Sequence, residues 1–457
     1  MKLTGECCCC TTGGRSILSY SSELGYFIGL KQFFLGANGF HPVMYKDIRM
    51  RNRSLLICVM VLLSLLLSAC GGVGSSTASQ QRLLIEPDDG RGPILEAIAG
   101  AKNNIRLTIY EITDLQAISQ SPAAPADSIV QALINQAQKG LTVQVIVDQN
   151  KYETGSSSPP VKKAVEALRS AGAVVHPSSN AFCYTHQKTF VIDGPTTGSP
   201  DLQGTAIILS LNLMPGYFST TRDYGVITKD PGIVKEVSRV FDADFTLVNA
   251  PSACKYGHSP ATTSPPPGAS DTPSLSEPNL LWSPVNSKPK LQQLIGSTKK
   301  SLVLTTEELV DADMVCQIQA LAQSPGKPSV RILLSGDTGS NASAVKTLMG
   351  LGLSNLSIRV MPGLPTKPSA TIPQTPLYMH GKQVIVDGAQ AFLGSENLTN
   401  TSLIQNRELG ILFTDAGMVA KLQSIFESDF TTQGNSLPAQ ACKEGPGCAI
   451  ITCPQAP

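Results

Sequence analysis

Short apolar runs alternate with amphipathic stretches along most of the chain. Residues 105–110 and 143–147 are apolar runs of strand length, and each ends at an acidic residue. Between them, apolar residues recur at helical spacing at Ile129, Leu133 and Ala137. Strands that alternate with helices predict an α/β fold with a largely parallel sheet.

The second half of the chain repeats this order. The opening run 83–86 has a counterpart at 280–283, and each half closes on an amphipathic helix, at 241–245 and 426–430. Matched positions stay 185 to 197 residues apart, which indicates one internal duplication. We therefore expect two similar lobes, each a mostly parallel mixed sheet flanked by helices, that share one active site at a pseudo-twofold interface.

The pattern also gives the expected divisions of the chain. Residues near 265 are rich in Pro, Ser and Thr, which is typical of a flexible surface linker. Residues 1–49 are expected to be a misassigned N-terminal extension, with Met50 as the true start. The other predicted parts are a lipoprotein-type signal peptide (50–70), a tether (71–82), a first lobe (83–250), the linker (251–279), a second lobe (280–432) and a cysteine-containing tail (433–457).

The segment that begins at Met50 has the features of an export signal. Two arginines precede an apolar run, 55–67, which ends in small residues before Cys70. The run is short for a membrane span. The sequence around Cys70 resembles a bacterial lipoprotein signal, which makes this cysteine the expected lipidation site; an ordinary signal anchor is the alternative. We expect an exported cell-envelope lipoprotein, in the outer membrane or periplasm if the cell has two membranes, or a secreted protein.

The amino-acid composition narrows the class of protein to which the chain can belong. The chain has 457 residues, 42% of them hydrophobic, which is enough for a sizeable core. Lys and Arg number 35 against 34 Asp and Glu, which argues against a dedicated nucleic-acid binder, although a local groove could be basic. Six cysteines follow Cys70, an even number that permits disulfides in an exported protein, including one that ties down the tail.

One motif carries the chemistry, and it occurs twice. A histidine, any residue, a lysine, four residues and an aspartate stand at His186, Lys188 and Asp193 and again at His380, Lys382 and Asp387. In both copies a serine, an asparagine two residues later and an acid 13 residues after the serine follow: Ser210, Asn212 and Asp223, then Ser395, Asn397 and Glu408. The chain has only 5 histidines, so two matching copies are a strong signal.

These residue types suit the transfer of a phosphodiester. One histidine can attack phosphorus to form a phosphohistidine, while the other protonates the leaving alcohol and later deprotonates the incoming water or alcohol. Lysines and asparagines can hold the non-bridging oxygens, and acids can fix each imidazole tautomer. This set of groups requires no divalent metal, so we expect no cofactor.

The motifs closely resemble those of the phospholipase D superfamily, over roughly residues 83–430. The resemblance implies that His186 and His380 are nucleophile and general acid/base, with His186 favoured as nucleophile. It makes Lys188, Lys382, Asn212 and Asn397 the phosphate cradle, bordered by Ser210 and Ser395. Asp223 and Glu408 orient the histidines. Asp193 and Asp387 are grouped with the catalytic residues of the motif, in structural or electrostatic roles. Leu209, where the family prefers glycine, and Asp223, in place of the usual glutamate, are departures in the first copy.

The expected function is hydrolysis or transphosphatidylation of phospholipids through a phosphohistidine. The alternatives are a cardiolipin-synthase-like phosphatidyltransferase, a nuclease of the same superfamily and a catalytically silent surface-binding lipoprotein. The expected partners are a phospholipid or other phosphodiester and a membrane surface reached through the lipid anchor; we expect a monomer without an obligate protein partner. Acids also end two matched strands, at Glu111 and at Glu307–Glu308. Because strand-end acids are more often helix caps or solvated groups, we expect these to lie outside the site.

Overall fold

The computed structural model describes residues 81–115, 128–153, 158–247, 275–363, 377–431, 436–444 and 447–454. All of them belong to one compact unit, residues 78–457. The expected signal peptide, Cys70 and most of the linker lie outside the described residues. Within the described ranges, no helix has the length and apolar character needed to cross a membrane.

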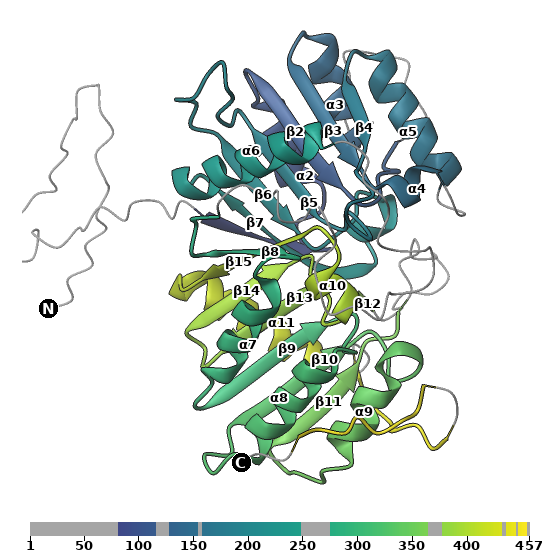
Figure 1. Ribbon diagram of the computed structural model, residues 1–457, viewed down its shortest axis with the longest axis vertical. Helices are drawn as coiled ribbons and strands as arrows, with labels where there is room; N and C mark the ends of the chain where they lie inside the picture. Colours follow the sequence, from purple (N-terminus) through teal and green to yellow (C-terminus); the bar gives the residue numbers. More distant parts are fainter. Residues whose placement is uncertain are drawn as a thin grey trace, which may run out of the picture. The chain divides into compact units, whose positions relative to one another are not determined.

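The first lobe is a mixed sheet flanked by helices (Figure 1). Its strands lie in the order β1-β7-β6-β5-β2-β3-β4. They are β1 (Gln81–Glu86), β2 (Asn104–Ile109), β3 (Thr142–Val147), β4 (Val174–Pro177), β5 (Lys188–Ile192), β6 (Thr205–Leu209) and β7 (Thr221–Thr228). The helices of this lobe are α2 (Gly92–Ala99), α3 (Ile129–Gln138), the short α4 (Gln149–Glu153), α5 (Ser158–Ser170) and α6 (Pro231–Thr246), with a 3-10 turn, η2 (Pro215–Phe218).

The second lobe repeats this arrangement in the order β16-β11-β10-β9-β13-β14-β15-β8. Its strands are β8 (Leu280–Ser283), β9 (Ser301–Thr306), β10 (Ser329–Leu334), β11 (Leu356–Val360), β13 (Lys382–Val386), β14 (Gln390–Gly394), β15 (Glu408–Phe413) and β16 (Leu437–Pro438). Its helices are α7 (Ser287–Gly296), α8 (Ala312–Gln323), α9 (Ala342–Met349), α10 (Asn400–Ile404) and α11 (Ala416–Thr431), with a 3-10 turn, η4 (Gly339–Asn341).

The expected two-lobed α/β architecture with mixed sheets is confirmed, and its strand directions are refined. Within the lobes, the parallel pairs are β2–β3, β3–β4, β9–β10 and β10–β11, whose connections contain a crossover helix. The pairs from β5 to β7 and from β13 to β15 are antiparallel. Consecutive strands that are joined by a short turn, without a crossover helix, pair in the antiparallel direction. The pairs β1–β7, β2–β5, β9–β13, β8–β15 and β11–β16 are antiparallel as well. Antiparallel pairs therefore outnumber the parallel ones, so the sheets are mixed but not mostly parallel.

Alternation along the strands builds three layers of core. Phe190 and Ile192 on β5 face α2, α3 and α5, whereas Val191 between them faces α6. A matching core lies between the second sheet and α7, α8 and α9. The central core contains residues of both sheets together with α6 and α11. Because this apolar layer is shared, the two lobes are packed into one body.

The two lobes also exchange short segments. The strand β12 (Tyr378–Met379), which comes just before the second motif, pairs with β7 of the first lobe. In the reciprocal position, Thr185 forms a bridge with Arg407 of the second lobe. A Cβ on Gly381 would lie 2.5 Å from the ring of Tyr224, so this close approach requires glycine. Each histidine motif is thus anchored on the opposite lobe.

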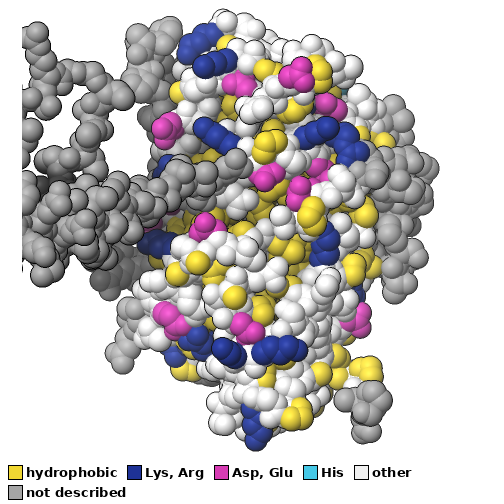
Figure 2. Space-filling model, turned by 90° about the vertical axis from the view of Figure 1, so that its left-hand side faces the viewer, with side chains coloured by type: hydrophobic (Ala, Val, Ile, Leu, Met, Phe, Trp, Pro, Cys, Tyr) yellow, Lys and Arg dark blue, Asp and Glu magenta, His cyan; other side chains and the backbone are white. Residues whose placement is uncertain are grey.

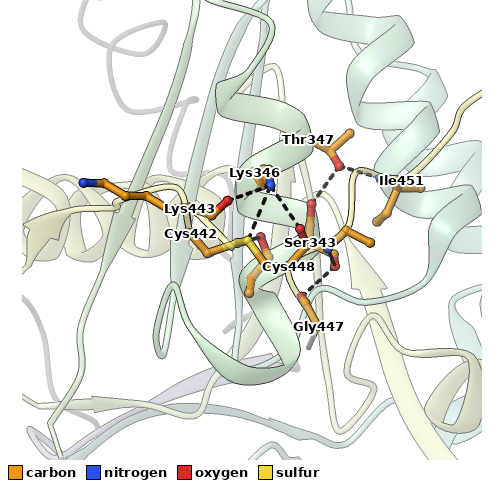
Figure 3. The surroundings of a disulfide bond; sticks show 10 residues. Ser343, Lys346, Thr347, Cys442, Lys443, Gly447, Cys448 and Ile451 are labelled. Carbon is orange, nitrogen blue, oxygen red and sulfur yellow. Dashed lines mark hydrogen bonds between the residues drawn. A yellow bond between two sulfur atoms is a disulfide. The ribbon is translucent and has the colours of Figure 1, made fainter. Parts of the chain in front are cut away.

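The C-terminal tail is tied to the second lobe (Figure 3). β16 extends the edge of the sheet beside β11, and disulfides join Cys442 to Cys448 and Cys316, on α8, to Cys453. Lys346 Nζ donates to the carbonyl of Cys448 at 3.1 Å. The structure therefore shows both a bridge within the tail and one that fastens it to a helix.

Candidate active site

The two histidine–lysine pairs lie at the ends of equivalent central strands. Lys188 begins β5 and Lys382 begins β13, and both side chains are buried. Each ammonium group turns back to its own motif: Lys188 Nζ donates to the carbonyl of His186 at 2.5 Å, and Lys382 Nζ donates to that of His380. The lysines are therefore held beside the histidines that precede them.

Each histidine is oriented by an acid from the other lobe. His186 Nδ1 lies 2.8 Å from Glu408 Oε2, and His380 Nδ1 lies 2.8 Å from Asp223 Oδ1. A neutral imidazole whose Nδ1–H donates to a carboxylate has its lone pair on Nε2. The crossed pairing brings both motifs into one site and fixes both rings.

The orienting acids are themselves held in place. Ser210 Oγ donates to Asp223 Oδ1 at 2.6 Å. Ser402 Oγ donates to Glu408 Oε1 at 2.7 Å. Against the effect of burial, His186 lowers the pKa of Glu408, and Lys188 and a hydrogen bond from Ser395 lower it too. The shorter Asp223 reaches His380 at the same distance at which Glu408 reaches His186. The departure from glutamate in the first copy therefore leaves this contact intact.

Burial and neighbouring charges shift the pKa values of His186 and Lys188 away from their usual values. Burial, assisted by the charge of Lys188, lowers the pKa of His186 to about 4, despite the opposing effect of Glu408. Burial likewise lowers the pKa of Lys188 to about 7, against the attraction of Glu408. At neutral pH, His186 is thus an uncharged imidazole, able to act as a nucleophile.

The predicted asparagines lie in the same site, and aromatic rings surround it. Asn397 Nδ2 donates to a carboxylate oxygen of Glu307 at 3.2 Å, and Asn212 is hydrogen-bonded to Tyr217. The ring of Tyr217 lies edge-on to His380, with 4.8 Å between centroids, and that of Tyr110 lies 4.6 Å from His186 in the same manner. These rings restrict the movement of the imidazoles.

Asp193 and Asp387 do not belong to this group. Asp193 Oδ1 accepts from the backbone N–H of Asn103 at 2.6 Å, and Asp387 Oδ1 accepts from that of Lys300 at 2.7 Å. A strand rises about 3.3 Å per residue, so an aspartate five residues after Lys188 lies about 16 Å along the strand from it. Their grouping with the catalytic residues is corrected: each caps the turn before a central strand.

The structure places Glu307 inside the site. Its carboxylate lies 3.2 Å from Lys382 Nζ and 3.5 Å from His380 Nε2. The expectation that strand-end acids lie outside the site is wrong for Glu307, whereas Glu308 accepts from Ser340 Oγ, away from the motifs. No repeat could have revealed Glu307, because Tyr110 occupies its equivalent position in the first lobe.

Two further carboxyl groups lie behind the orienting acids. Glu86 is paired with Asp223 in the register of β1 and β7, and burial raises its pKa to about 8. Burial together with the charge of Glu408 raises the pKa of Glu396 to about 8. Near neutral pH both groups keep their proton, which avoids a second negative charge beside each orienting acid.

The sequence interpretation missed two arginines next to the orienting acids. Arg222 donates to Asp429 on α11, with Nε 2.7 Å from Oδ2, and Arg407 Nη2 lies 2.7 Å from Asp244 Oδ1 on α6. Both pairs join opposite lobes. The sequence did contain a signal for these pairs: the two arginines are 185 residues apart, and so are the two aspartates, which is also the spacing of the two orienting acids. In the described part of the chain, no group of three or more His, Cys, Asp or Glu residues is placed to hold a metal ion.

Two duplicated α/β lobes that join paired histidine–lysine motifs in one site define a protein of phosphodiester chemistry. The chain belongs to the phospholipase D superfamily: the family model described as the PLD-like domain of cardiolipin synthase matches residues 94–245 and 291–430. None of the curated proteins matches the chain in sequence.

Two solved structures, both with a TM-score of 0.52, show the same fold at low sequence identity. Phosphatidylserine synthase from Haemophilus influenzae is 14% identical with a TM-score of 0.52, and the match covers 79% of this chain and 88% of that one. Polyphosphate kinase from Porphyromonas gingivalis is 16% identical with a TM-score of 0.52; the match covers 78% of this chain but only 48% of that one. Nuc, a phospholipase D family member from Salmonella typhimurium, is 18% identical over 35% of this chain and 97% of its own, with a TM-score of 0.29.

Proposed function

We propose that this protein transfers a phosphatidyl group from a phospholipid to water or to an alcohol through a phosphohistidine on His186. The crossed pairing of His186 with Glu408 and of His380 with Asp223 is the observation that carries the proposal. It gives two oriented imidazoles beside two buried lysines, which are the groups that a two-step displacement at phosphorus needs.

In the first step, Nε2 of His186 attacks phosphorus, and the bond between phosphorus and the leaving alcohol breaks. His380 is suited to protonate that alcohol, because each of its ring nitrogens faces a carboxylate oxygen, of Asp223 at 2.8 Å and of Glu307 at 3.5 Å. An imidazolium can donate from both nitrogens. Lys188 and Lys382 stabilise the negative charge on the non-bridging oxygens.

In the second step, His380 has given up its proton and acts as the base. It accepts the proton of a water or an alcohol, whose oxygen attacks phosphorus while the bond to His186 Nε2 breaks. Both histidines then return to their starting protonation states. Hydrolysis and transfer differ only in the acceptor, so the same site supports both outcomes.

A phospholipid is the substrate best supported. The matching family model is that of the cardiolipin synthase PLD-like domain, and one protein of similar fold is a phosphatidylserine synthase. The expected lipid anchor would hold the site near a membrane. On the described part of the face shown in Figure 2, Lys and Arg are interspersed with Asp and Glu, which gives less support to a nuclease.

An alcohol trap tests this proposal. The protein that starts at Gly71 should be incubated with phosphatidylcholine and phosphatidylglycerol in detergent micelles with ethanol and EDTA, and the lipids analysed by mass. We expect phosphatidic acid and phosphatidylethanol from the wild type and neither product from His186→Ala or His380→Ala. Activity retained in His186→Ala would contradict the mechanism, and a folded wild type without lipid products would contradict the substrate class.

A further inference from the structure

The motif of His380 and Lys382 forms the second half-site, and that of His186 and Lys188 the first. In the second half-site, a carboxylate of the protein itself lies where an anion would bind. Oε2 of Glu307 lies 3.2 Å from Lys382 Nζ, 3.2 Å from Asn397 Nδ2 and 3.5 Å from His380 Nε2. Tyr378 donates its hydroxyl to the other carboxylate oxygen at 2.7 Å. The lysine and the asparagine belong to the phosphate cradle that the family resemblance implies, and the histidine is the proposed acid and base. One carboxylate oxygen contacts all three.

The first half-site is built differently at the equivalent position. Thr108 pairs with Thr189, and Thr305 pairs with Gln383, the residues that directly follow the two motif lysines. Two residues further along, Tyr110 and Glu307 are therefore equivalent. Tyr110 presents an aromatic ring, with Lys188 Nζ 5.1 Å from its centroid. The two copies of the motif thus differ in the group that faces their lysine.

Glu307 is held as a charged carboxylate. Burial alone would raise its pKa, but Lys382 and His380 outweigh that effect and hold the pKa well below the usual range of a glutamate. A carboxylate and a phosphodiester each carry one negative charge and accept from the same donors. An oxygen of a phosphodiester and Oε2 of Glu307 cannot occupy the same position against Lys382, Asn397 and His380 at the same time. The side chain of Glu307 is 21% exposed, which leaves it a direction in which to move.

We propose that Glu307 is a resident carboxylate that occupies the phosphate position of the second half-site, and that a phosphodiester binds by displacing it. The proposal rests on the proposed function for the identity of the phosphate-binding groups. Exchange of one monoanion for another leaves the charge of the site unchanged. Glu307 therefore raises the KM for every phosphodiester, and Tyr378 contributes by holding the carboxylate in place.

Binding of inorganic phosphate to Glu307→Gln tests this directly. The amide keeps the shape of the side chain, but it is a weaker acceptor than a carboxylate for Lys382. We expect the Kd for inorganic phosphate, measured by isothermal titration calorimetry, to fall by about tenfold relative to the wild type, which corresponds to about 1.4 kcal/mol. The matched control is Glu308→Gln, which removes the same charge one residue away and should leave the Kd unchanged.

Tyr378→Phe provides a second variant, because it loosens Glu307 without changing any charge. It should tighten phosphate binding in the same direction and to a smaller extent. Phosphate affinity that is unchanged or weaker in both variants would overturn the proposal and leave Glu307 as a residue that merely positions His380 and Lys382. Phosphate binding needs no turnover, so this outcome is distinct from a failure of the phospholipid substrate.

Discussion

The two histidines belong to the same motif, yet their surroundings make them chemically different. His186 faces Glu408 from Nδ1, and its pKa is lowered to about 4, chiefly by burial. His380 lies between the carboxylates of Asp223 and Glu307. One ring is thus prepared to attack as a neutral base, and the other is placed to carry a proton.

The pH dependence should reflect His186 and Lys188. His186 is protonated as the pH falls through about 4, so kcat/KM should decrease there. The charge of Lys188, and phosphate binding with it, should be lost as the pH rises through about 7 in the free enzyme. A profile of kcat/KM with a soluble phosphodiester checks both limbs. Lys188→Arg keeps the charge and should remove the alkaline limb; an unchanged limb would contradict this assignment.

Replacing the orienting acids should affect catalysis, and replacing the turn-capping aspartates should not. Asp223→Asn and Glu408→Gln remove the carboxylate that fixes each imidazole, so kcat should fall by about 100-fold or more. Asp193→Asn and Asp387→Asn weaken bonds to backbone N–H groups and should lower Tm with kcat retained. Measurements of kcat and Tm for the four variants distinguish a catalytic role from a turn-capping role. A loss of kcat in Asp193→Asn without unfolding would return that residue to the catalytic group.

At the level of elements, reciprocal contacts place β7 and β15 against the opposite lobe. Arg222, which directly precedes Asp223, bonds to Asp429 on α11 of the second lobe. Arg407, which directly precedes Glu408, bonds to Asp244 on α6 of the first. Each pair fixes an arginine, and the residue directly after that arginine orients a histidine. The packing of α6 and α11 is therefore coupled to the geometry of the site.

Breaking one of these pairs should destabilise the protein strongly. Arg222→Met leaves Asp429 buried without its partner, which typically costs about 3–5 kcal/mol of the free energy of unfolding. The double variant Arg222→Met, Asp429→Leu should recover much of that loss. Urea unfolding of the single and double variants measures the coupling. Equal stability of the wild type and Arg222→Met would show that the pair does not hold the lobes together.

At the level of the whole molecule, the duplication made most of the fold and the motif predictable. The repeated patterns located both lobes and both histidine–lysine pairs. The crossed pairing could not be predicted, because equal spacing in both copies is compatible with Asp223 facing either His186 or His380. Glu307 was expected to lie outside the site, because strand-end acids are more often helix caps or solvated groups and its counterpart in the first lobe, Tyr110, is not an acid. Disulfide partners such as Cys316 and Cys453 are 137 residues apart and meet only in the folded chain.

A pre-steady-state burst with bis(p-nitrophenyl) phosphate is the sharpest test of a covalent intermediate on His186, because p-nitrophenolate leaves without the help of an acid. We expect His380→Ala to release about one equivalent of p-nitrophenolate per protein and then to stall, since the second step lacks its base. The peptide that contains His186 should then carry the phosphoryl adduct, and His186→Ala should show no burst. A burst in His186→Ala, with none in His380→Ala, would reverse the roles of the two histidines. No burst in either variant would contradict a covalent intermediate.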